Sequence, residues 1–215
     1  MRASTWSAPS RRTPPAGPQL TSDQGDTPAF SRLLAAGAIS ECVLVLLALG
    51  LGRLGRVPAF EHLRLDGESA LIGAAGALPM LALLLWCLRT TWGPMRRLVA
   101  LVEERLGPYL TGASVGGIVL LAVLAGVGEE ALFRGVIQTW LAERAPLWVA
   151  VAAASLLFGV GHWLSASYAI LASFIGAYLG ILFLLSGNLL APMVAHAAYD
   201  VVALFVLARR LDARR

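Results

Sequence analysis

The sequence predicts an all-α membrane protein, a polytopic bundle of about six transmembrane helices with one amphipathic surface helix. Of its 215 residues, 58% are hydrophobic, and the mean hydropathy is +0.73. Charged residues make up only 14%, whereas a typical soluble domain carries about 25%. Apolar runs of membrane-spanning length recur along the chain, as expected for a bilayer whose hydrocarbon core is roughly 30 Å thick. These observations exclude a soluble globular domain.

Six apolar runs predict the individual spans. They cover residues 33–51, 69–88, 115–145, 147–163, 168–185 and 189–207. The third would form a helix of about 45 Å, so it must tilt or protrude from the bilayer. Glu41 stands near the middle of the first run. It is either a buried polar strut or a cavity-lining group, and we favour the strut.

The surface helix is predicted from residues 94–106. Leu98, Leu101, Val102 and Leu106 recur at helical spacing on one face. Arginine and glutamate residues fill the remainder of the helix. Because this segment is too polar to span the bilayer, we expect it to lie on the membrane surface.

The arginines predict the orientation of the chain. With both termini inside, the N-terminal tail, the second loop and the C-terminal tail hold 4 arginines each, whereas the first loop holds 3 and the third only Arg144. The positive-inside rule therefore predicts a multi-pass protein of the plasma membrane with both termini cytoplasmic. The net charge of +4 comes from arginines near the ends of spans, so we do not expect nucleic acid as a partner.

The chain divides into four predicted regions. Residues 1–30 are rich in Pro, Ser, Thr and Gly and lack an apolar signal-peptide core, which favours a disordered cytoplasmic tail. Residues 31–110 hold two spans and the surface helix. Residues 111–208 hold the remaining spans, and residues 209–215 form a basic tail.

Two carboxylates and a guanidinium stand inside the third run. An ionisable group in a membrane-length segment costs a few kcal/mol or more and indicates a functional site. Glu130 and Arg134 are i,i+4 neighbours in the favourable order, whereas Glu129 points about 100° away from Glu130. One carboxylate is therefore expected to be structural and the other free for chemistry. The alternative is a helix end that emerges among lipid headgroups, where all three would be solvated.

Two more polar clusters are expected at the same depth. His162 ends the fourth run, and His196 and Asp200 share one face of the sixth. Glu129 and His162 both lie about 24 Å along their helices from the turn at residues 145–146. His196 and Asp200 lie about 12 and 18 Å from the following turn on the same side. A hairpin that protrudes by one or two turns brings all four into one layer.

The residue types in this layer indicate hydrolysis by water. A carboxylate with two imidazoles can hold and deprotonate a water molecule, either directly or as ligands of a divalent metal such as zinc. Glu129, His162 and His196 are the candidate ligands, and the same residues also suit a mechanism without metal. No serine, cysteine or lysine is placed as a nucleophile. Inside a membrane, a peptide bond is the first candidate substrate.

Three motifs resemble those of the CPBP (Abi) intramembrane protease family, which includes the type II CAAX prenyl proteases and proteins linked to bacteriocin processing or immunity. They are Glu129-Glu130-x-x-x-Arg134, Phe158-x-x-x-His162 and His196-x-x-x-Asp200. The resemblance covers residues 115–207. It implies an intramembrane endopeptidase that acts on a membrane protein or on a lipidated peptide, such as a prenylated or bacteriocin-like one.

The resemblance also implies roles for the motif residues. Glu129 would be the general base on the attacking water, and His162 would help to hold that water. Glu130 and Arg134 would be the supporting pair.

The remaining two motif residues, His196 and Asp200, would stabilise the tetrahedral oxyanion or help to hold a metal. The family often has asparagine at the last position, and an ionised aspartate cannot donate a hydrogen bond to an oxyanion. Asp200 must therefore act in its protonated form, or orient His196 instead.

Two other functions use the same residues. A non-catalytic immunity or scaffold protein of the same fold remains open, because intact motifs do not prove turnover. A proton-coupled transporter could use Glu41, Glu129 and His162 as a relay. Such transporters are built from internal repeats with broken helices, and we find neither in the sequence.

Overall fold

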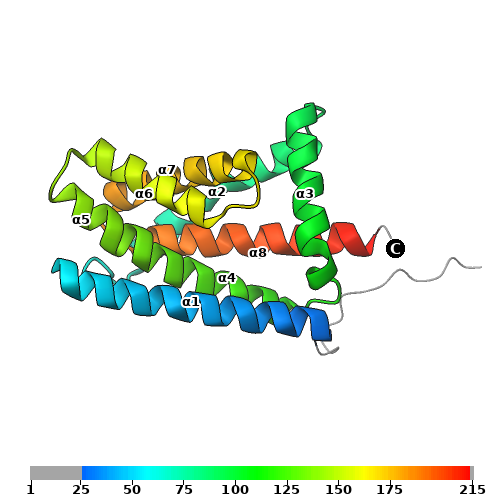
Figure 1. Ribbon diagram of the computed structural model, residues 1–215, viewed down its shortest axis with the longest axis horizontal. Helices are drawn as coiled ribbons and strands as arrows, with labels where there is room; N and C mark the ends of the chain where they lie inside the picture. The colour runs from blue at the N-terminus through cyan, green and yellow to red at the C-terminus, as the bar shows by residue number, and fades with distance from the viewer. Residues whose placement is uncertain (1–25, 214–215) are drawn as a thin grey trace, which may run out of the picture.

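The computed structural model describes residues 26–213, and the prediction of an all-α membrane bundle is confirmed (Figure 1). The elements are α1 (Pro28–Gly55), α2 (Gly67–Arg89), α3 (Gly93–Leu110), α4 (Val115–Glu130), the π-helix η1 (Ala131–Gln138), α5 (Thr139–Ala142), α6 (Leu147–Gly161), α7 (Ala166–Ser186) and α8 (Leu190–Asp212).

Five of the described helical segments are long and apolar enough to cross a membrane. They are α1, α2, the continuous segment Val115–Ala142, α7 and α8. The predicted fourth span is the shorter helix α6, which has 15 residues and is therefore about 22 Å long. The hydrocarbon core of a bilayer is roughly 30 Å thick, so α6 alone is too short to cross it. Helix α6 ends at Gly161, and His162 follows directly as its C-cap residue.

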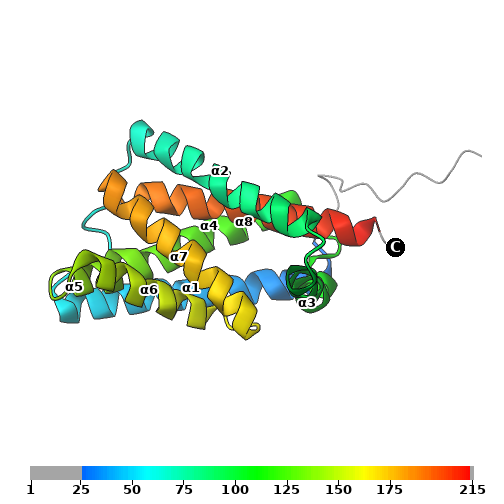
Figure 2. The same cartoon turned by 90° about the horizontal axis from the view of Figure 1, so that it is seen from above.

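Helix α8 lies at the centre of the bundle. It packs along α2 on one side and α4 on the other, and α1 covers the outer side of α4 (Figures 1 and 2). Helices α6 and α7 form a hairpin that packs against η1. The fourth and sixth predicted spans are therefore both neighbours of the third.

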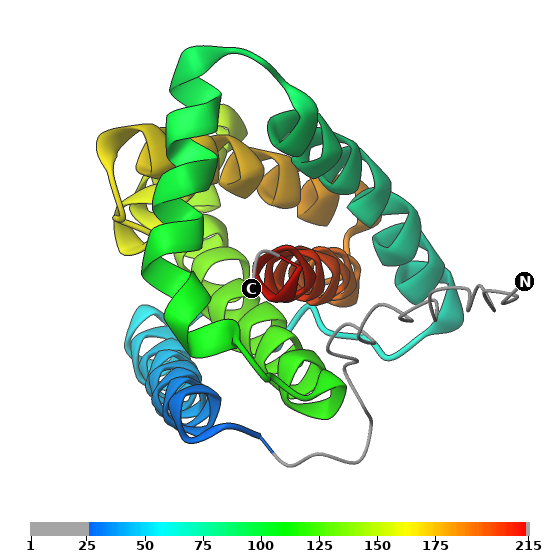
Figure 3. The ribbon, with the colours of Figure 1, turned by 90° about the vertical axis from the view of Figure 1, so that its right-hand side faces the viewer.

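Helix α3 is the predicted amphipathic helix. It runs across one end of the bundle, nearly perpendicular to α8, at the end where the described part of the chain starts and finishes (Figures 1 and 3). Its buried residues are Met95, Leu98, Gly107 and Leu110. Leu101 is partly buried.

The first helix begins earlier than the sequence suggested. Most of the predicted tail, residues 1–25, lies outside the described residues, but α1 already begins at Pro28. Thr27 caps the helix and donates its hydroxyl to the carbonyl of Thr111 at 2.9 Å, and the carboxylate of Asp26 accepts from the Ser114 amide at 2.8 Å. Phe30 is fully buried. These contacts hold the start of α1 against the turn between α3 and α4.

A buried asparagine fastens the other end of the bundle. Nδ2 of Asn188 shares its two hydrogens among the Arg64 carbonyl, the Asp66 carboxylate and the Ser69 hydroxyl, which lie 2.7–2.8 Å away. Its side-chain oxygen accepts from the amides of Arg64 and Leu190. Asn188 thus connects the α7–α8 turn to the start of α2, which fixes the position of α8 along its axis.

Candidate active site

The site begins where α4 changes into a π-helix. Helix α4 passes into η1 directly after Glu130, and the hydroxyl of Thr139 donates to the Arg134 carbonyl, five residues earlier, at 2.9 Å. In a π-helix each backbone hydrogen bond spans five residues, which widens the helix. Such turns are frequent at functional sites. Here the widened turn carries the buried side chains of Arg134 and Gln138 toward α7.

Glu130 is the hub of a buried polar cluster. Its Oε1 accepts a hydrogen bond from Nη1 of Arg134 and another from Nδ1 of His196, both at 2.8 Å. All three side chains are almost completely buried. Since burying one charge without a partner is far more costly than burying a paired one, the three side chains depend on one another.

Arg134 and Gln138 reach two carbonyls on α7 that are one turn apart. Nη2 of Arg134 donates to the Gly176 carbonyl at 2.8 Å, and Nε2 of Gln138 donates to the Gly180 carbonyl at 3.0 Å. A side chain at either glycine would press on neighbouring groups, on Gln138 in the case of Gly180. The two glycines therefore allow η1 and α7 to approach closely.

Glu129 faces the two imidazoles. Within the described part of the chain its Oε2, like Oε2 of Glu130, has no hydrogen-bond partner. This atom lies 3.5 Å from Nε2 of His162 and 3.9 Å from Nε2 of His196. Glu129 thus presents a free acceptor atom to both imidazoles.

The orientation of His162 is set by Phe158. Nδ1 of His162 lies 2.9 Å from the Phe158 carbonyl oxygen. A carbonyl can only accept, so Nδ1 carries a proton and the neutral ring has its lone pair on Nε2. The ring also stacks on the Phe158 ring, with centroids 4.3 Å apart. The Nε2 lone pair therefore faces Glu129.

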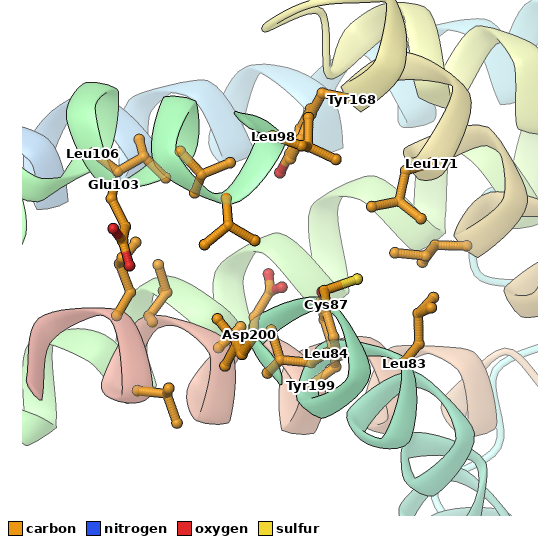
Figure 4. A pocket seen from close by; sticks show the side chains of 18 of the residues that line it. Leu83, Leu84, Cys87, Leu98, Glu103, Leu106, Tyr168, Leu171, Tyr199 and Asp200 are labelled. Carbon is orange, nitrogen blue, oxygen red and sulfur yellow. The ribbon is translucent and has the colours of Figure 1, made fainter. Parts of the chain in front are cut away.

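Asp200 lies on the opposite side of His196 from Glu130. Its Oδ2 is 3.6 Å from Nε2 of His196. Asp200 and His162 also line a cavity of about 250 Å³, into which the Asp200 carboxylate points (Figure 4). We call Glu129, His162, His196 and Asp200 the site layer.

The structure brings all six motif residues together. Glu130 and Arg134 form the buried pair, and the four residues of the site layer lie next to it. The sequence reasoning missed the part played by Phe158. The Arg134 guanidinium lies 4.6 Å from the centroid of the Phe158 ring, on the motif that also holds His162. Its spacing, four residues before His162, was the available signal.

Glu41 on α1 packs beside this layer. It is 8% exposed and its Oε2 has no hydrogen-bond partner among residues 26–213. A Cβ at Gly128 would lie 2.6 Å from this oxygen, so the missing side chain at Gly128 makes room for the carboxyl group. Glu41 also interacts electrostatically with Glu129, His196 and Asp200. A polar strut should bridge hydrogen-bonding groups, and Oε2 does not.

The proposed metal ligands do not form a metal-binding group. Across residues 26–213, no group of three or more His, Cys, Asp or Glu side chains is arranged to hold a metal ion. Nδ1 of His196 is engaged with Glu130 and Nδ1 of His162 with a carbonyl, while both Nε2 atoms approach a single oxygen of Glu129. The geometry within residues 26–213 gives no support to the set Glu129, His162 and His196 as metal ligands.

Comparison with known proteins shows that the site lies in a segment of the chain that matches a known family. Residues 111–202 match the family described as Type II CAAX prenyl endopeptidase Rce1-like. An uncharacterized protein, YpbD, from Bacillus subtilis (strain 168) is 37% identical over 92 residues, which are 41% of this chain and 44% of that protein. The match thus spans less than half the length of this relative. No solved structure matches the chain.

The matched segment contains the six motif residues and the helices from α4 to most of α8. It ends two residues after Asp200 and leaves out α1, α2 and α3. The polytopic helical bundle agrees with an intramembrane protease fold. Residues 111–202 of this protein therefore resemble the Rce1-like family of type II CAAX prenyl endopeptidases.

Proposed function

We propose that the protein is an intramembrane endopeptidase that hydrolyses a peptide bond with a water molecule activated by Glu129. The observation that carries this proposal is the 3.5 Å separation between Oε2 of Glu129 and Nε2 of His162. Both atoms are acceptors in the tautomer that the Phe158 carbonyl imposes. One water about 2.8 Å from each atom can donate a hydrogen bond to both, which leaves its lone pairs free to attack.

The reaction then needs only groups already in the layer. The water oxygen bonds to the substrate carbonyl carbon while Glu129 takes the released proton. Glu129 next delivers this proton to the amide nitrogen, and the carbon–nitrogen bond breaks to give a carboxylic acid and an amine. His162 orients the water throughout, because its ring is fixed by the Phe158 carbonyl and ring.

His196 is the proposed donor to the oxyanion. Its Nδ1 donates to Glu130, so a hydrogen bond from Nε2 to the oxyanion requires both ring protons. Glu130 faces one ring nitrogen and Asp200 the other. These two carboxylates stabilise the doubly protonated ring by Coulombic attraction, which assigns Asp200 the role of orienting and supporting His196.

Glu130 and Arg134 are positioning residues. Both are buried away from the cavity, and neither touches it. Arg134 holds Glu130 from the side of α7, and Glu130 in turn holds His196. The substrate is proposed to be a membrane protein or a lipidated peptide, because the site layer lies within membrane-length helices.

The test identifies membrane proteins that remain uncleaved when Glu129 is replaced. Membranes containing the native protein, Glu129→Gln or the matched control Glu104→Gln are compared by quantitative mass spectrometry of membrane proteins and released peptides. Glu104 is exposed on α3, away from the layer. We expect a set of proteins to stay full-length with Glu129→Gln and to be cleaved by the other two. Identical fragment patterns in all three would overturn the proposal and favour a non-catalytic scaffold.

A further inference from the structure

A tyrosine at the start of α7 faces the site layer. Tyr168 lies in the first turn of α7, after the N-cap residue Ser165. Tyr168 and Asp200 both line the cavity of about 250 Å³, one from α7 and the other from α8. The Tyr168 side chain and the Asp200 carboxylate point into this cavity from opposite walls, toward one another (Figure 4). A phenol hydroxyl is thus directed at the residues of the proposed reaction.

The ring of Tyr168 is held in place, whereas its hydroxyl has no protein partner. The ring packs against the buried cluster of Cys87, Met95 and Leu98. Within residues 26–213, only the backbone amide of Tyr168 makes a hydrogen bond outside the helix ladder, to the Ser165 hydroxyl. A polar group inside a protein is nearly always paired with protein, water or a ligand. The Tyr168 hydroxyl therefore has a hydrogen bond to give to a molecule that occupies the cavity.

Tyr168 lies close enough to interact with both ends of the site layer. It interacts electrostatically with Asp200 and with Glu129. The cavity lining contains a second tyrosine, Tyr199, whose interactions are with Asp200, Tyr168 and Cys87. Tyr168 is therefore the better placed of the two to reach a group held between Glu129 and Asp200.

The proposed reaction has so far assigned one donor, His196, to the oxyanion. Oδ2 of Asp200 lies 3.6 Å from Nε2 of His196, and a carboxylate so near repels the negative charge that develops there. Donors fixed in advance around the oxyanion lower the barrier of such reactions. His162 cannot supply a second one, because its Nε2 carries the lone pair that faces Glu129.

We propose that Tyr168 is a further catalytic residue, which donates a hydrogen bond from its hydroxyl to the oxyanion of the tetrahedral intermediate. This proposal rests on the proposed endopeptidase function. The hydroxyl keeps its proton throughout, so the proton transfers through Glu129 are unchanged. Because the ring is already packed, the hydroxyl needs little reorganisation when the charge develops. None of the three sequence motifs includes Tyr168.

Tyr168→Phe removes the hydroxyl and keeps the ring. On a peptide that the native protein cleaves, we expect kcat to fall about 100-fold, which is the usual effect of losing one oxyanion donor. The value of KM should change little, because the hydrogen bond strengthens only as the negative charge forms. The midpoint temperature of thermal unfolding should stay at the native value. Full kcat in the Tyr168→Phe protein would overturn the proposal.

Tyr178→Phe is the matched control on the same helix. The Tyr178 hydroxyl donates to the Gly76 carbonyl at 2.8 Å, and Tyr178 does not belong to the cavity lining. We expect this variant to unfold at a lower temperature and to keep the native kcat, which is the reverse of the pattern at Tyr168. An equal loss of kcat in both variants would show a general effect of losing a phenol hydroxyl and would overturn the catalytic role.

A double variant separates donation to the oxyanion from orientation of Asp200. Tyr168→Phe is measured again in the Asp200→Asn protein. If Tyr168 acts on the oxyanion itself, we expect the substitution to lower kcat by about the same factor in both backgrounds. No further loss in the Asp200→Asn background would show that the hydroxyl acts only through Asp200, and the role as a donor to the oxyanion would be wrong.

A binding measurement tests the donor without turnover. The probe is acetyl-tetraleucine amide with its central peptide bond replaced by a phosphinate, which is tetrahedral and negatively charged like the intermediate. The same peptide with a neutral, trigonal ketomethylene group is the control. Calorimetry in lipid nanodiscs compares Glu129→Gln with the double variant Glu129→Gln, Tyr168→Phe.

We expect loss of the hydroxyl to weaken binding of the phosphinate about tenfold, as for a hydrogen bond to a charged group, and to leave binding of the ketomethylene peptide unchanged. Equal phosphinate affinities, or no phosphinate binding by either protein, would overturn the donor role. The two proposals fail separately: unchanged fragment patterns with Glu129→Gln count against the endopeptidase, whereas the phosphinate result concerns Tyr168 alone.

Discussion

Nδ1 of His196 and Oε1 of Glu130 lie 2.8 Å apart in the buried interior, although 66 residues separate them in the chain. The same oxygen accepts from Arg134. This single atom therefore joins the first and third sequence motifs. Oε2 of Glu129, the adjacent residue, instead lies 3.5 Å from Nε2 of His162 and 3.9 Å from Nε2 of His196. Two neighbouring glutamates thus have different surroundings, and substitutions at the two should have different consequences.

Glu130→Gln should destabilise the fold, and Glu129→Gln should not. Removing the Glu130 charge leaves Arg134 buried without its ionic partner, and breaking a buried pair costs about 3–5 kcal/mol. Replacing Glu129 by Gln removes no hydrogen bond at Oε2. The Glu129→Gln variant should therefore keep the midpoint temperature of thermal unfolding of the native protein. Thermal unfolding in detergent, followed by circular dichroism, measures both. Equal midpoints for the two variants would contradict this division.

Asp200→Asn should lower the turnover rate and leave substrate binding nearly unchanged. The Asp200 carboxylate faces Nε2 of His196 at 3.6 Å, and its charge supports the second ring proton that the oxyanion donor needs. We expect kcat to fall about tenfold, or about 1.4 kcal/mol, with little change in KM. Steady-state kinetics on one cleaved peptide in liposomes measures the two parameters. Full activity of the Asn variant would instead assign Asp200 the role of a protonated donor to the oxyanion.

Much of the buried Glu130–Arg134 pair and of the site layer could be predicted from spacing alone. The i,i+4 separation of Glu130 and Arg134 predicts a contact on any helix, and counting residues from the turns placed His162 and Glu129 at one depth. The fold class followed from apolar runs of membrane length. These features depend on local helix geometry, and the spacing of residues in the sequence reflects that geometry.

Other features depend on contacts that no local pattern contains. Apolar composition continues through Trp163, so it could not show that α6 ends at Gly161. The π-helical turn after Glu130 leaves no signal at a period of 3.6 residues. The Gly176 carbonyl that accepts from Arg134 lies 42 residues away, and only the packing of η1 on α7 brings the two together.

Glu41→Gln should leave the protein folded and at least as stable as the native form. A buried carboxylate oxygen without a hydrogen-bond partner has a desolvation cost, and a neutral amide of nearly the same shape reduces this cost. Denaturant-induced unfolding in mixed micelles gives the free energy of unfolding for each form. A loss greater than about 1 kcal/mol, the typical net value of a hydrogen bond, would show that Glu41 is a polar strut after all.

Acid should loosen the end of the bundle at which Asn188 joins the α7–α8 turn to α2. The Ser69 backbone amide donates to the Asp66 carboxylate, and the Ser69 hydroxyl and the Asn188 amide add to this; these hydrogen bonds lower the pKa of Asp66 below its usual 3.8. Because the pKa is lower in the folded state, the stabilisation is fully present above the unfolded-state value. It is lost as the pH falls through the lower folded-state value.

We therefore expect amide exchange at the start of α2 to accelerate below about pH 4, near the unfolded-state pKa of aspartate. Asp66→Asn should show little of this acid-dependent acceleration, since its side chain carries no titrating proton. Glu68→Gln removes an exposed carboxylate from the first turn of the same helix and controls for the lost charge. Hydrogen–deuterium exchange with mass spectrometry, corrected for the intrinsic exchange rate at each pH, measures all three forms. Similar acid dependence in the native and Asp66→Asn proteins would show that the hydrogen bonds to Asp66 contribute nothing to the stability of this end.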